Sequence, residues 1–182
     1  HTAGNRLLVF ARKPAPIQVA WIGYVNTTGL DTMDYLLADD FVSPPEGAQS
    51  FTEQLVKLPG SYLCYEPPQY APPVSSLPAL LSGHCTFGCF NNLSKVSGEV
   101  VVIWSRILRA LPGSRLVLKN TSLNDQHAQE RYRQLFLAQG IQPGRVDLLG
   151  SSPHIELLKY YGRIDMALDP FPYTGGLSTC EA

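Results

Sequence analysis

The hydrophobic pattern of this chain changes at a proline-rich stretch, residues 66–78. Before it, the apolar runs are short and rich in β-branched and aromatic residues, which is typical of buried strands. The elements expected there are strands at 18–24, 35–39 and 62–65, a helix end within 5–12 and a helical segment at 51–58. Because proline fixes φ and removes a backbone donor, residues 66–78 are expected to form an extended connector between two lobes.

After the connector, strands and helices are expected to alternate regularly. The predicted strands are 86–90, 115–119, 146–149 and 164–168, and the predicted helices are 97–111, 124–139 and 154–163. Gly140 is expected to end the second of these helices as its C′ residue. Alternation at this spacing predicts a parallel, doubly wound α/β sheet.

Length and composition narrow the classes of protein. The 182 residues suffice for one large or two small domains, and 45% hydrophobic with 16% charged residues argues against disorder. A formal net charge of -1 gives no electrostatic case for nucleic acid or for an acidic membrane surface. No apolar run has the length of a membrane span, and no signal peptide is recognisable. His1 is not an initiator, so the chain is expected to be a fragment of a longer protein.

The four cysteines are expected to be reduced thiols, which indicates a reducing, cytoplasmic compartment. They are Cys64, Cys85, Cys89 and Cys180, and no His or Cys pair follows at zinc-ligand spacing. A disulfide or a metal site remains the alternative interpretation. Among the histidines, only His154 follows a strand near the expected ligand edge.

In open α/β sheets, ligands bind beyond the carboxyl ends of the strands. Residues 21–29, 90–95 and 173–181 are expected there. In 173–181, two glycines precede a helix start, where free N–H groups favour anions. Ser178 or Thr179 can cap this helix or donate to a phosphate, and Glu181 can accept from sugar hydroxyls. An ordinary capped helix after a turn explains the same pattern.

The other two segments offer further candidates. Lys95 can neutralise a diphosphate leaving group, and Asn92 can bond a ring or sugar edge. Gly23 permits close approach of a ligand, and the hydroxyls of Thr27 and Thr28 can meet a sugar. The alternatives are a polar turn with a solvated lysine and a strand end followed by a turn.

Three long motifs together carry a resemblance to a known family. They are residues 12–24 with 26–30 and 33–35 close behind, residues 86–95, and residues 165–182. Over nearly the whole chain, the sequence resembles the catalytic region of the O-GlcNAc transferase and SPINDLY family, especially its bacterial members.

The resemblance implies an α/β fold of two Rossmann-like lobes, as in a GT-B type glycosyltransferase. Residues 1–65 would then end the first lobe, 66–78 would connect the lobes, and 79–182 would begin the nucleotide-sugar-binding second lobe. The family transfers a sugar from a nucleotide diphosphate to Ser or Thr hydroxyls of proteins, with inversion and without a catalytic metal or other cofactor. The implied partners are UDP-GlcNAc and acceptor proteins, held by upstream tetratricopeptide repeats, with no nucleic acid and no membrane.

The resemblance also assigns roles to individual residues. Lys95 matches the family lysine at the diphosphate, and Asn92 stands beside it where animal enzymes have a glutamine. Gly23 matches a backbone position at the donor sugar. Ser178 matches a hydroxyl at the phosphates, with Thr179 next to it, and Glu181 matches an acidic residue that holds the ribose. The family residues proposed to act near the acceptor lie upstream of His1, so no base is assigned.

Some positions differ from the family pattern and leave the donor open. Val25 replaces a proline, and Gly176-Leu177 replaces a His-Thr pair of animal enzymes. His154 and Leu157 stand where animal enzymes have a lysine and a histidine near the nucleotide. UDP-GlcNAc is the first choice of donor. GDP-fucose, used by the plant SPINDLY branch, is the alternative.

Three other interpretations remain beside the protein-modifying enzyme. One is an enzyme of the same fold with another reaction, such as a sugar-nucleotide epimerase or a small-molecule glycosyltransferase. The second is a nucleotide-sugar-binding module without transferase activity. The third is a generic α/β domain with no ligand, which requires the three motifs to coincide by chance.

Overall fold

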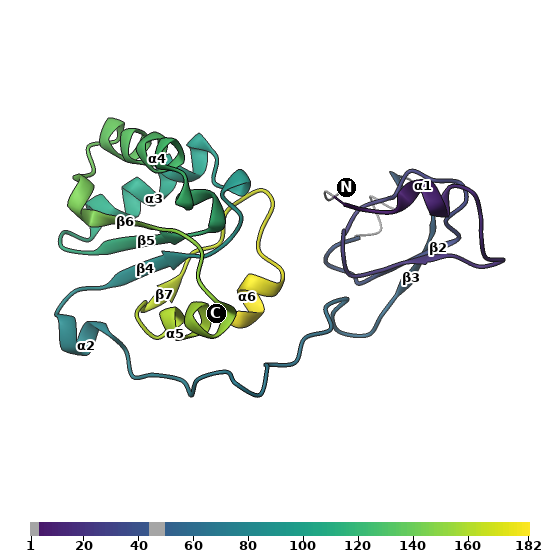
Figure 1. The fold of residues 1–182 in the computed structure, drawn as a ribbon, viewed down its shortest axis with the longest axis horizontal. Helices are drawn as coiled ribbons and strands as arrows, with labels where there is room; N and C mark the ends of the chain where they lie inside the picture. The colour runs from purple at the N-terminus through teal and green to yellow at the C-terminus, as the bar shows by residue number, and fades with distance from the viewer. Residues whose placement is uncertain (1–3, 44–49) are drawn as a thin grey trace. The chain divides into compact units, whose positions relative to one another are not determined.

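The computed structural model describes residues 4–43 and 50–182. The chain divides into two compact units, His1–Glu66 and Pro67–Ala182 (Figure 1). Each is described by itself below. The domain boundaries expected from the sequence stay a prediction.

The first unit contains a three-stranded parallel sheet. After the short helix α1 (Leu7–Phe10), the sheet has the order β1-β2-β3, from β1 (Val19–Ala20), β2 (Tyr35–Ala38) and β3 (Gln54–Lys57). The strand expected at 18–24 is therefore much shorter than predicted. Its continuation is bent at Ile22, whose φ is 61°.

Two sequence predictions in the first unit are wrong. The helical segment expected at 51–58 contains β3, because pairing with β2 along its length satisfies the backbone. The strand expected at 62–65 does not form. The N–H of Tyr62 donates to the Asp39 carboxylate (2.8 Å) and its carbonyl accepts from the Trp21 indole (2.9 Å), so both groups bond to side chains.

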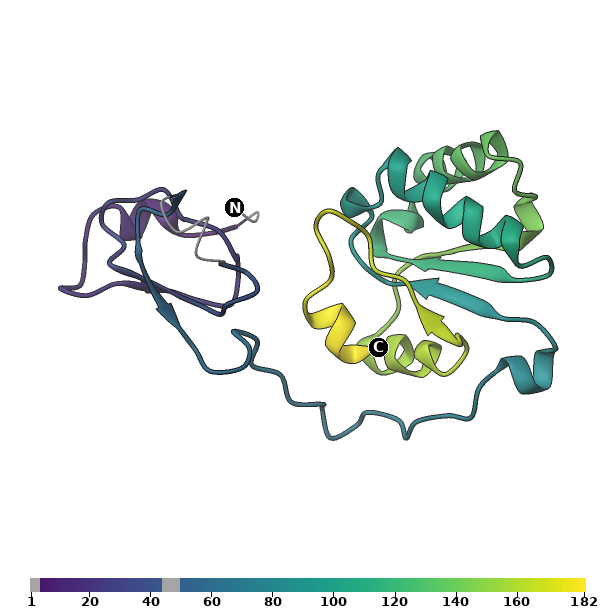
Figure 2. The same ribbon diagram turned by 180° about the vertical axis from the view of Figure 1, so that it is seen from behind.

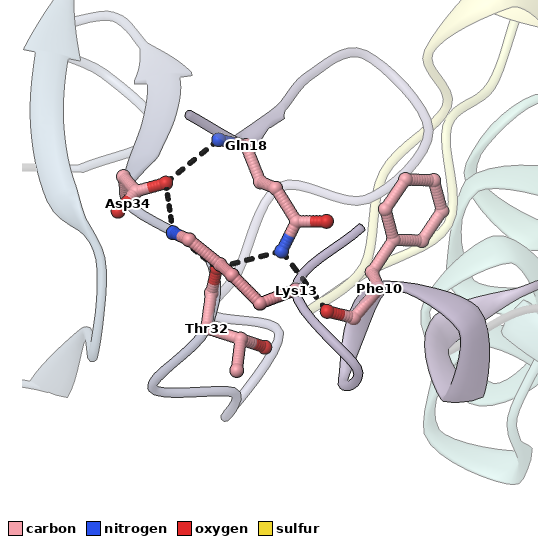
Figure 3. A network of polar contacts seen from close by, with 5 residues as sticks. All are labelled: Phe10, Lys13, Gln18, Thr32 and Asp34. Atoms are coloured by element: carbon pink, nitrogen blue, oxygen red, sulfur yellow. Dashed lines mark hydrogen bonds and ion pairs between the residues drawn. The ribbon is translucent and has the colours of Figure 1, made fainter. Parts of the chain in front are cut away.

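A polar network joins α1, β1 and β2 in the first unit (Figure 3). The Asp34 carboxylate accepts from the Lys13 ammonium and from the backbone N–H of Gln18 (2.7 Å). The Gln18 amide donates to the carbonyls of Phe10 (2.9 Å) and Thr32 (2.7 Å). The bond from Lys13 is the main reason that the pKa of Asp34 lies below its usual value.

The second unit is a doubly wound α/β sheet, as the sequence predicts. Its four parallel strands have the order β6-β5-β4-β7. They are β4 (Thr86–Cys89), β5 (Arg115–Lys119), β6 (Val146–Leu149) and β7 (Met166–Ala167). Helices α3 (Gly98–Ala110) and α4 (Gln126–Ala138) cover one face, and α5 (His154–Tyr161) and α6 (Leu177–Glu181) lie on the other (Figures 1 and 2).

The ends of the long helices follow local signals in the sequence. The Ser97 hydroxyl accepts from the N–H of Val100 (3.3 Å) and caps α3, and the Asp125 carboxylate caps α4. Gly140 follows α4 with φ of 76°, which confirms it as the C′ residue. Short 3-10 turns connect the other elements, namely η2 (Leu93–Lys95), η3 (Thr121–Asn124) and η4 (Pro143–Arg145).

A single apolar cluster lies between the sheet and the helices α3 and α4. Leu116 and Leu118 of β5 are fully buried there, against Val100 and Trp104 of α3 and Phe136 of α4. Burial of this much apolar surface is the main source of stability of the second unit.

The proline-rich segment has no helix or strand before α2 (Ala79–Ser82). Side chains of this segment and the N–H of Ala79, at the start of α2, bond to the rest of the second unit. Tyr70 bonds to His154 (2.9 Å), Ser75 donates to the carbonyl of Gly162 (3.4 Å), and the N–H of Ala79 donates to Asp165 (2.8 Å). No helix in the described part of the chain has the length and apolar character needed to cross a membrane.

Candidate functional site at the carboxyl ends of β4 and β7

A pocket of about 110 Å³ opens where β4 and β7 end. Its walls come from the residues after these strands, from α5 and from α6, and they include Phe90, Asn91, Tyr161, Asp169, Ser178 and Thr179. The carboxyl edge of the sheet therefore brings together two of the three segments expected at the site, 90–95 and 173–181.

A buried asparagine side chain lies at the centre of this edge. Asn91 is 5% exposed, and its amide N–H donates to the Asp169 carboxylate (3.0 Å). Its carbonyl oxygen accepts from the Ser178 hydroxyl (2.9 Å) and from the Lys95 ammonium (3.5 Å). The Thr179 hydroxyl donates to Asp169 (2.9 Å). These residues, Asn91, Asp169, Ser178, Thr179 and Lys95, are called the Asn91 cluster below.

Lys95 is the cation of this cluster. Its ammonium donates to the carbonyl of Thr174 (2.8 Å) and lies 4.6 Å from the centre of the Tyr173 ring. Burial lowers the pKa of Lys95 below its usual value, although the negative charge of Asp169 acts in the opposite direction. Partial burial strengthens the interaction of such a cation with an anion that displaces water from it.

The glycine turn before α6 is required by the crowding of the Asn91 cluster. A Cβ atom on Gly175 would lie 2.2 Å from the Thr179 hydroxyl and 2.8 Å from the Asp169 carboxylate. Real Cβ atoms do not approach other atoms this closely. Position 175 therefore has no room for a side chain, and only glycine fits there.

The helix α6 differs from its expected role. It has five residues, its N-cap is Gly176, and no side chain caps it. Of the two roles considered for Ser178 and Thr179, capping of the helix is wrong, because both hydroxyls bond within the Asn91 cluster. Donation to a phosphate stays a prediction. Leu177 is 57% exposed and lies at the first position of α6.

His154 and Glu181 are brought together by α5 and α6. The His154 Nε2 lies 2.8 Å from a Glu181 carboxylate oxygen, and the other ring nitrogen lies 2.9 Å from the Tyr70 hydroxyl. The Glu181 side chain is 8% exposed and that of His154 is 41% exposed. This pair offers a carboxylate and an imidazole at the edge that holds the Asn91 cluster.

The other predicted site residues lie elsewhere. The Asn92 side chain accepts from the N–H of Ser94 (3.0 Å) and caps η2. Gly23 lies in the first unit, where its N–H donates to the carbonyl of Trp21 (2.8 Å). The hydroxyls of Thr27 and Thr28, expected to meet a sugar, donate instead to the Glu53 carboxylate. The assignment of all these residues to a donor site stays a prediction.

No group of three or more His, Cys, Asp or Glu side chains that could hold a metal occurs in the described residues. The four cysteines are free thiols. Burial raises the pKa of Cys89, beside the cluster, to about 11, so this thiol stays protonated at neutral pH. The expectation that no metal is needed stays a prediction.

Sequence reasoning missed three residues of this edge, Asn91, Asp169 and Tyr70. A usable signal existed for the first two, since each is the first polar residue after a predicted strand. Those strands are neighbours in the sheet. No local pattern pointed to Tyr70, because its contact with His154 spans 84 positions.

Comparisons with known proteins support the motif-based resemblance. The family model described as Glycosyl transferase family 41 matches residues 1–72. The whole chain is 46% identical to a probable UDP-N-acetylglucosamine–peptide N-acetylglucosaminyltransferase SPINDLY of Petunia hybrida, and 45% identical to that of Arabidopsis thaliana. It spans about 20% of the length of these relatives.

A solved structure gives the same result for the fold. A mutant O-GlcNAc transferase of Thermobaculum terrenum is similar with a TM-score of 0.90 and 41% identity, over 97% of this chain and 33% of that one. The expected α/β fold with parallel sheets is confirmed. The resemblance stated from the three motifs is also confirmed.

Proposed function

We propose, for a chain homologous to the catalytic region of the O-GlcNAc transferase and SPINDLY family, that it forms the donor-binding part of a protein glycosyltransferase. The reaction proposed is transfer of GlcNAc from UDP-GlcNAc to Ser or Thr hydroxyls of proteins, with inversion. The names of the relatives, which are UDP-N-acetylglucosamine–peptide N-acetylglucosaminyltransferases, support this donor and a peptide acceptor.

The observation that carries the proposal is the position of Lys95 beside the Ser178 hydroxyl. Both side chains contact the same buried oxygen of Asn91, at 3.5 Å and 2.9 Å. An ammonium and a hydroxyl that converge at the ligand edge of a parallel sheet match the needs of a diphosphate. Lys95 would exchange its bond to the Thr174 carbonyl for one to a phosphate oxygen.

The chemistry needs charge stabilisation at the leaving group. The bond between the anomeric carbon and the β-phosphate oxygen breaks, and its electron pair leaves with UDP. The acceptor hydroxyl attacks the anomeric carbon from the opposite face and gives its proton to a base, for which we propose no residue of this chain. Lys95 and Ser178 stabilise the developing negative charge on the phosphate, which lowers the barrier without a metal ion.

The nucleoside would be held by Glu181 and His154. Glu181 can accept from the ribose hydroxyls, which requires His154 to give up its 2.8 Å contact with that carboxylate. The expected assembly is therefore a phosphate site at the Asn91 cluster and a nucleoside site between α5 and α6.

The test is calorimetric binding of UDP, GDP, UDP-GlcNAc and GDP-fucose to the full-length parent protein, with a chelator present. We expect tight binding of UDP and weak binding of GDP. Incubation with a protein mixture and labelled UDP-GlcNAc should then place label on Ser or Thr. A preference for GDP would assign the fucose donor instead. Binding without transfer would indicate a binding module, and binding of neither nucleotide would refute the donor site.

A further inference from the structure

We infer that Asn91 is the positioning residue of the donor site, which holds Lys95 and Ser178 in the arrangement that stabilises the leaving diphosphate. This inference rests on the proposed function. Asn91 itself need not contact the donor. Its part is to fix where the ammonium and the hydroxyl lie before the donor arrives.

The hydrogen-bond chemistry of the carboxamide supports this role. A carboxamide has two donors on nitrogen and two lone pairs on oxygen. The Asp169 carboxylate can only accept, so it orients the Asn91 nitrogen toward β7 at 3.0 Å. The oxygen must then face Lys95 and Ser178, and these two donors occupy both of its lone pairs.

The surroundings of Asn91 keep it rigid. It is 5% exposed, and its backbone carbonyl accepts from the Asn120 side chain (3.3 Å), which follows β5. The Asp169 carboxylate is fixed in turn by Thr179, and a Cβ atom on Gly175 would lie 2.8 Å from the Asp169 carboxylate and 3.0 Å from the Asn91 amide oxygen. Asn91 thus links the ends of three neighbouring strands to α6.

Rigid placement of the ammonium is what the reaction requires. A catalytic group that is displaced by about 1 Å can lose on the order of 100-fold in rate, although substrate binding changes little. Without Asn91, Lys95 would keep its bond to the Thr174 carbonyl but would lose the acceptor that ties it to Ser178. The neutral oxygen of Asn91 also orients the cation without cancelling its charge.

The experiment uses the full-length parent protein with Asn91→Ala, Asn91→Asp and the control Asn124→Ala. Asn124, in η3, also joins two segments through Ser151, and among the described residues no hydrogen bond links it to Lys95. We expect Asn91→Ala to lower kcat by about 10- to 100-fold with little change in the KM for the donor. Asn124→Ala is expected to leave both constants near those of the unchanged protein.

A second readout does not depend on activity. The rate at which an amine-acylating reagent labels Lys95, measured by mass spectrometry, should rise in Asn91→Ala because the ammonium loses one of its two hydrogen-bond acceptors. It should fall in Asn91→Asp, because a new carboxylate raises the pKa of the lysine. A purely structural role would not move the rate in opposite directions. Unchanged labelling of Lys95 in both variants would overturn the inference, whereas opposite shifts without sugar transfer would refute only the proposed function.

Discussion

The second unit has a continuous apolar cluster between its sheet and the helices α3 and α4. In the described part of the first unit, the buried apolar side chains are Met33, Leu36 and Ala38. Two buried carboxylates hold the loops of this unit in place instead. Asp39 (3% exposed) and Glu53 (4% exposed) accept hydrogen bonds from the loops that surround the short strands.

Glu53 illustrates how a carboxylate can organise a loop. It accepts from the hydroxyls of Thr27 (2.7 Å) and Thr28 and from the N–H of Thr28 (2.7 Å). Burial acts to raise the pKa of Glu53, but these bonds outweigh it, so the pKa lies below its usual value. The comparison teaches that polar clusters serve different purposes in the two units. In the first they stabilise loops, and in the second a polar cluster lies at the edge of a core that is already stable.

The largest expected effect is a fall in kcat when the cation of the Asn91 cluster in the second unit is removed. Lys95→Ala in the full-length parent protein should lower kcat roughly 100- to 1,000-fold, because the charge of the leaving diphosphate loses its cation. The affinity for UDP should fall much less. Steady-state kinetics and calorimetry measure the two quantities separately. Lys159→Ala, which removes an exposed lysine paired with Glu156, is the matched control and should leave kcat unchanged.

A kcat of Lys95→Ala equal to that of the unchanged protein would contradict the proposed role of Lys95. The polar cluster of the second unit would then have no demonstrated part in the reaction. The polar edge of the second unit would serve to stabilise loops, as the carboxylates of the first unit do.

A smaller effect is expected from the main carboxylate of the first unit. Glu53→Gln should destabilise this unit by about 1–3 kcal/mol, since the donors around it lose a charged acceptor. Hydrogen exchange of peptides that cover β2 and β3 would report the loss, and peptides of β4 and β5 should be unaffected. The control is Asp40→Asn, which breaks an exposed ion pair with Lys57 and should cost no more than about 1 kcal/mol. Equal losses of stability in the two variants would show that the buried Glu53 contributes no more to the stability of this unit than the exposed Asp40 does.

The smallest effect is a difference in acid sensitivity. The pKa values of Asp34, Asp39 and Glu53 lie below their usual values of 3.8 and 4.5. A carboxylate with a lowered folded-state pKa contributes stability above its unfolded pKa and loses it as pH falls through the folded pKa. Hydrogen exchange, corrected for its intrinsic pH dependence, should therefore show β2 and β3 opening before β4 and β5 on acidification below about pH 4.5. Simultaneous opening would mean that the carboxylates do not distinguish the units.

The sequence alone determined the elements whose signals are local. Strands β5 and β6 have the predicted bounds, α3 begins after its Ser97 cap, and α4 ends at Ala138, shortly before its C′ residue Gly140. Their apolar runs and caps lie within one element, so no distant partner is needed to predict them. The family resemblance likewise came from long contiguous motifs. Local signals were weaker in the first unit, where bonds to Asp39 and pairing with β2 replaced the structures expected at 62–65 and 51–58.

The tertiary structure decided which polar side chains meet. Asn91 and Asp169 are 78 positions apart, and only the pairing of β4 with β7 places them 3.0 Å from each other. Ser178 and Thr179, for which capping of the helix was one of two expected roles, instead bond to the two residues that this pairing brings together. A hydrogen bond depends on distances of about 3 Å between atoms, and periodicity along a chain predicts faces and edges of elements only. The chemistry at the edge of the sheet follows from the pairing of its strands.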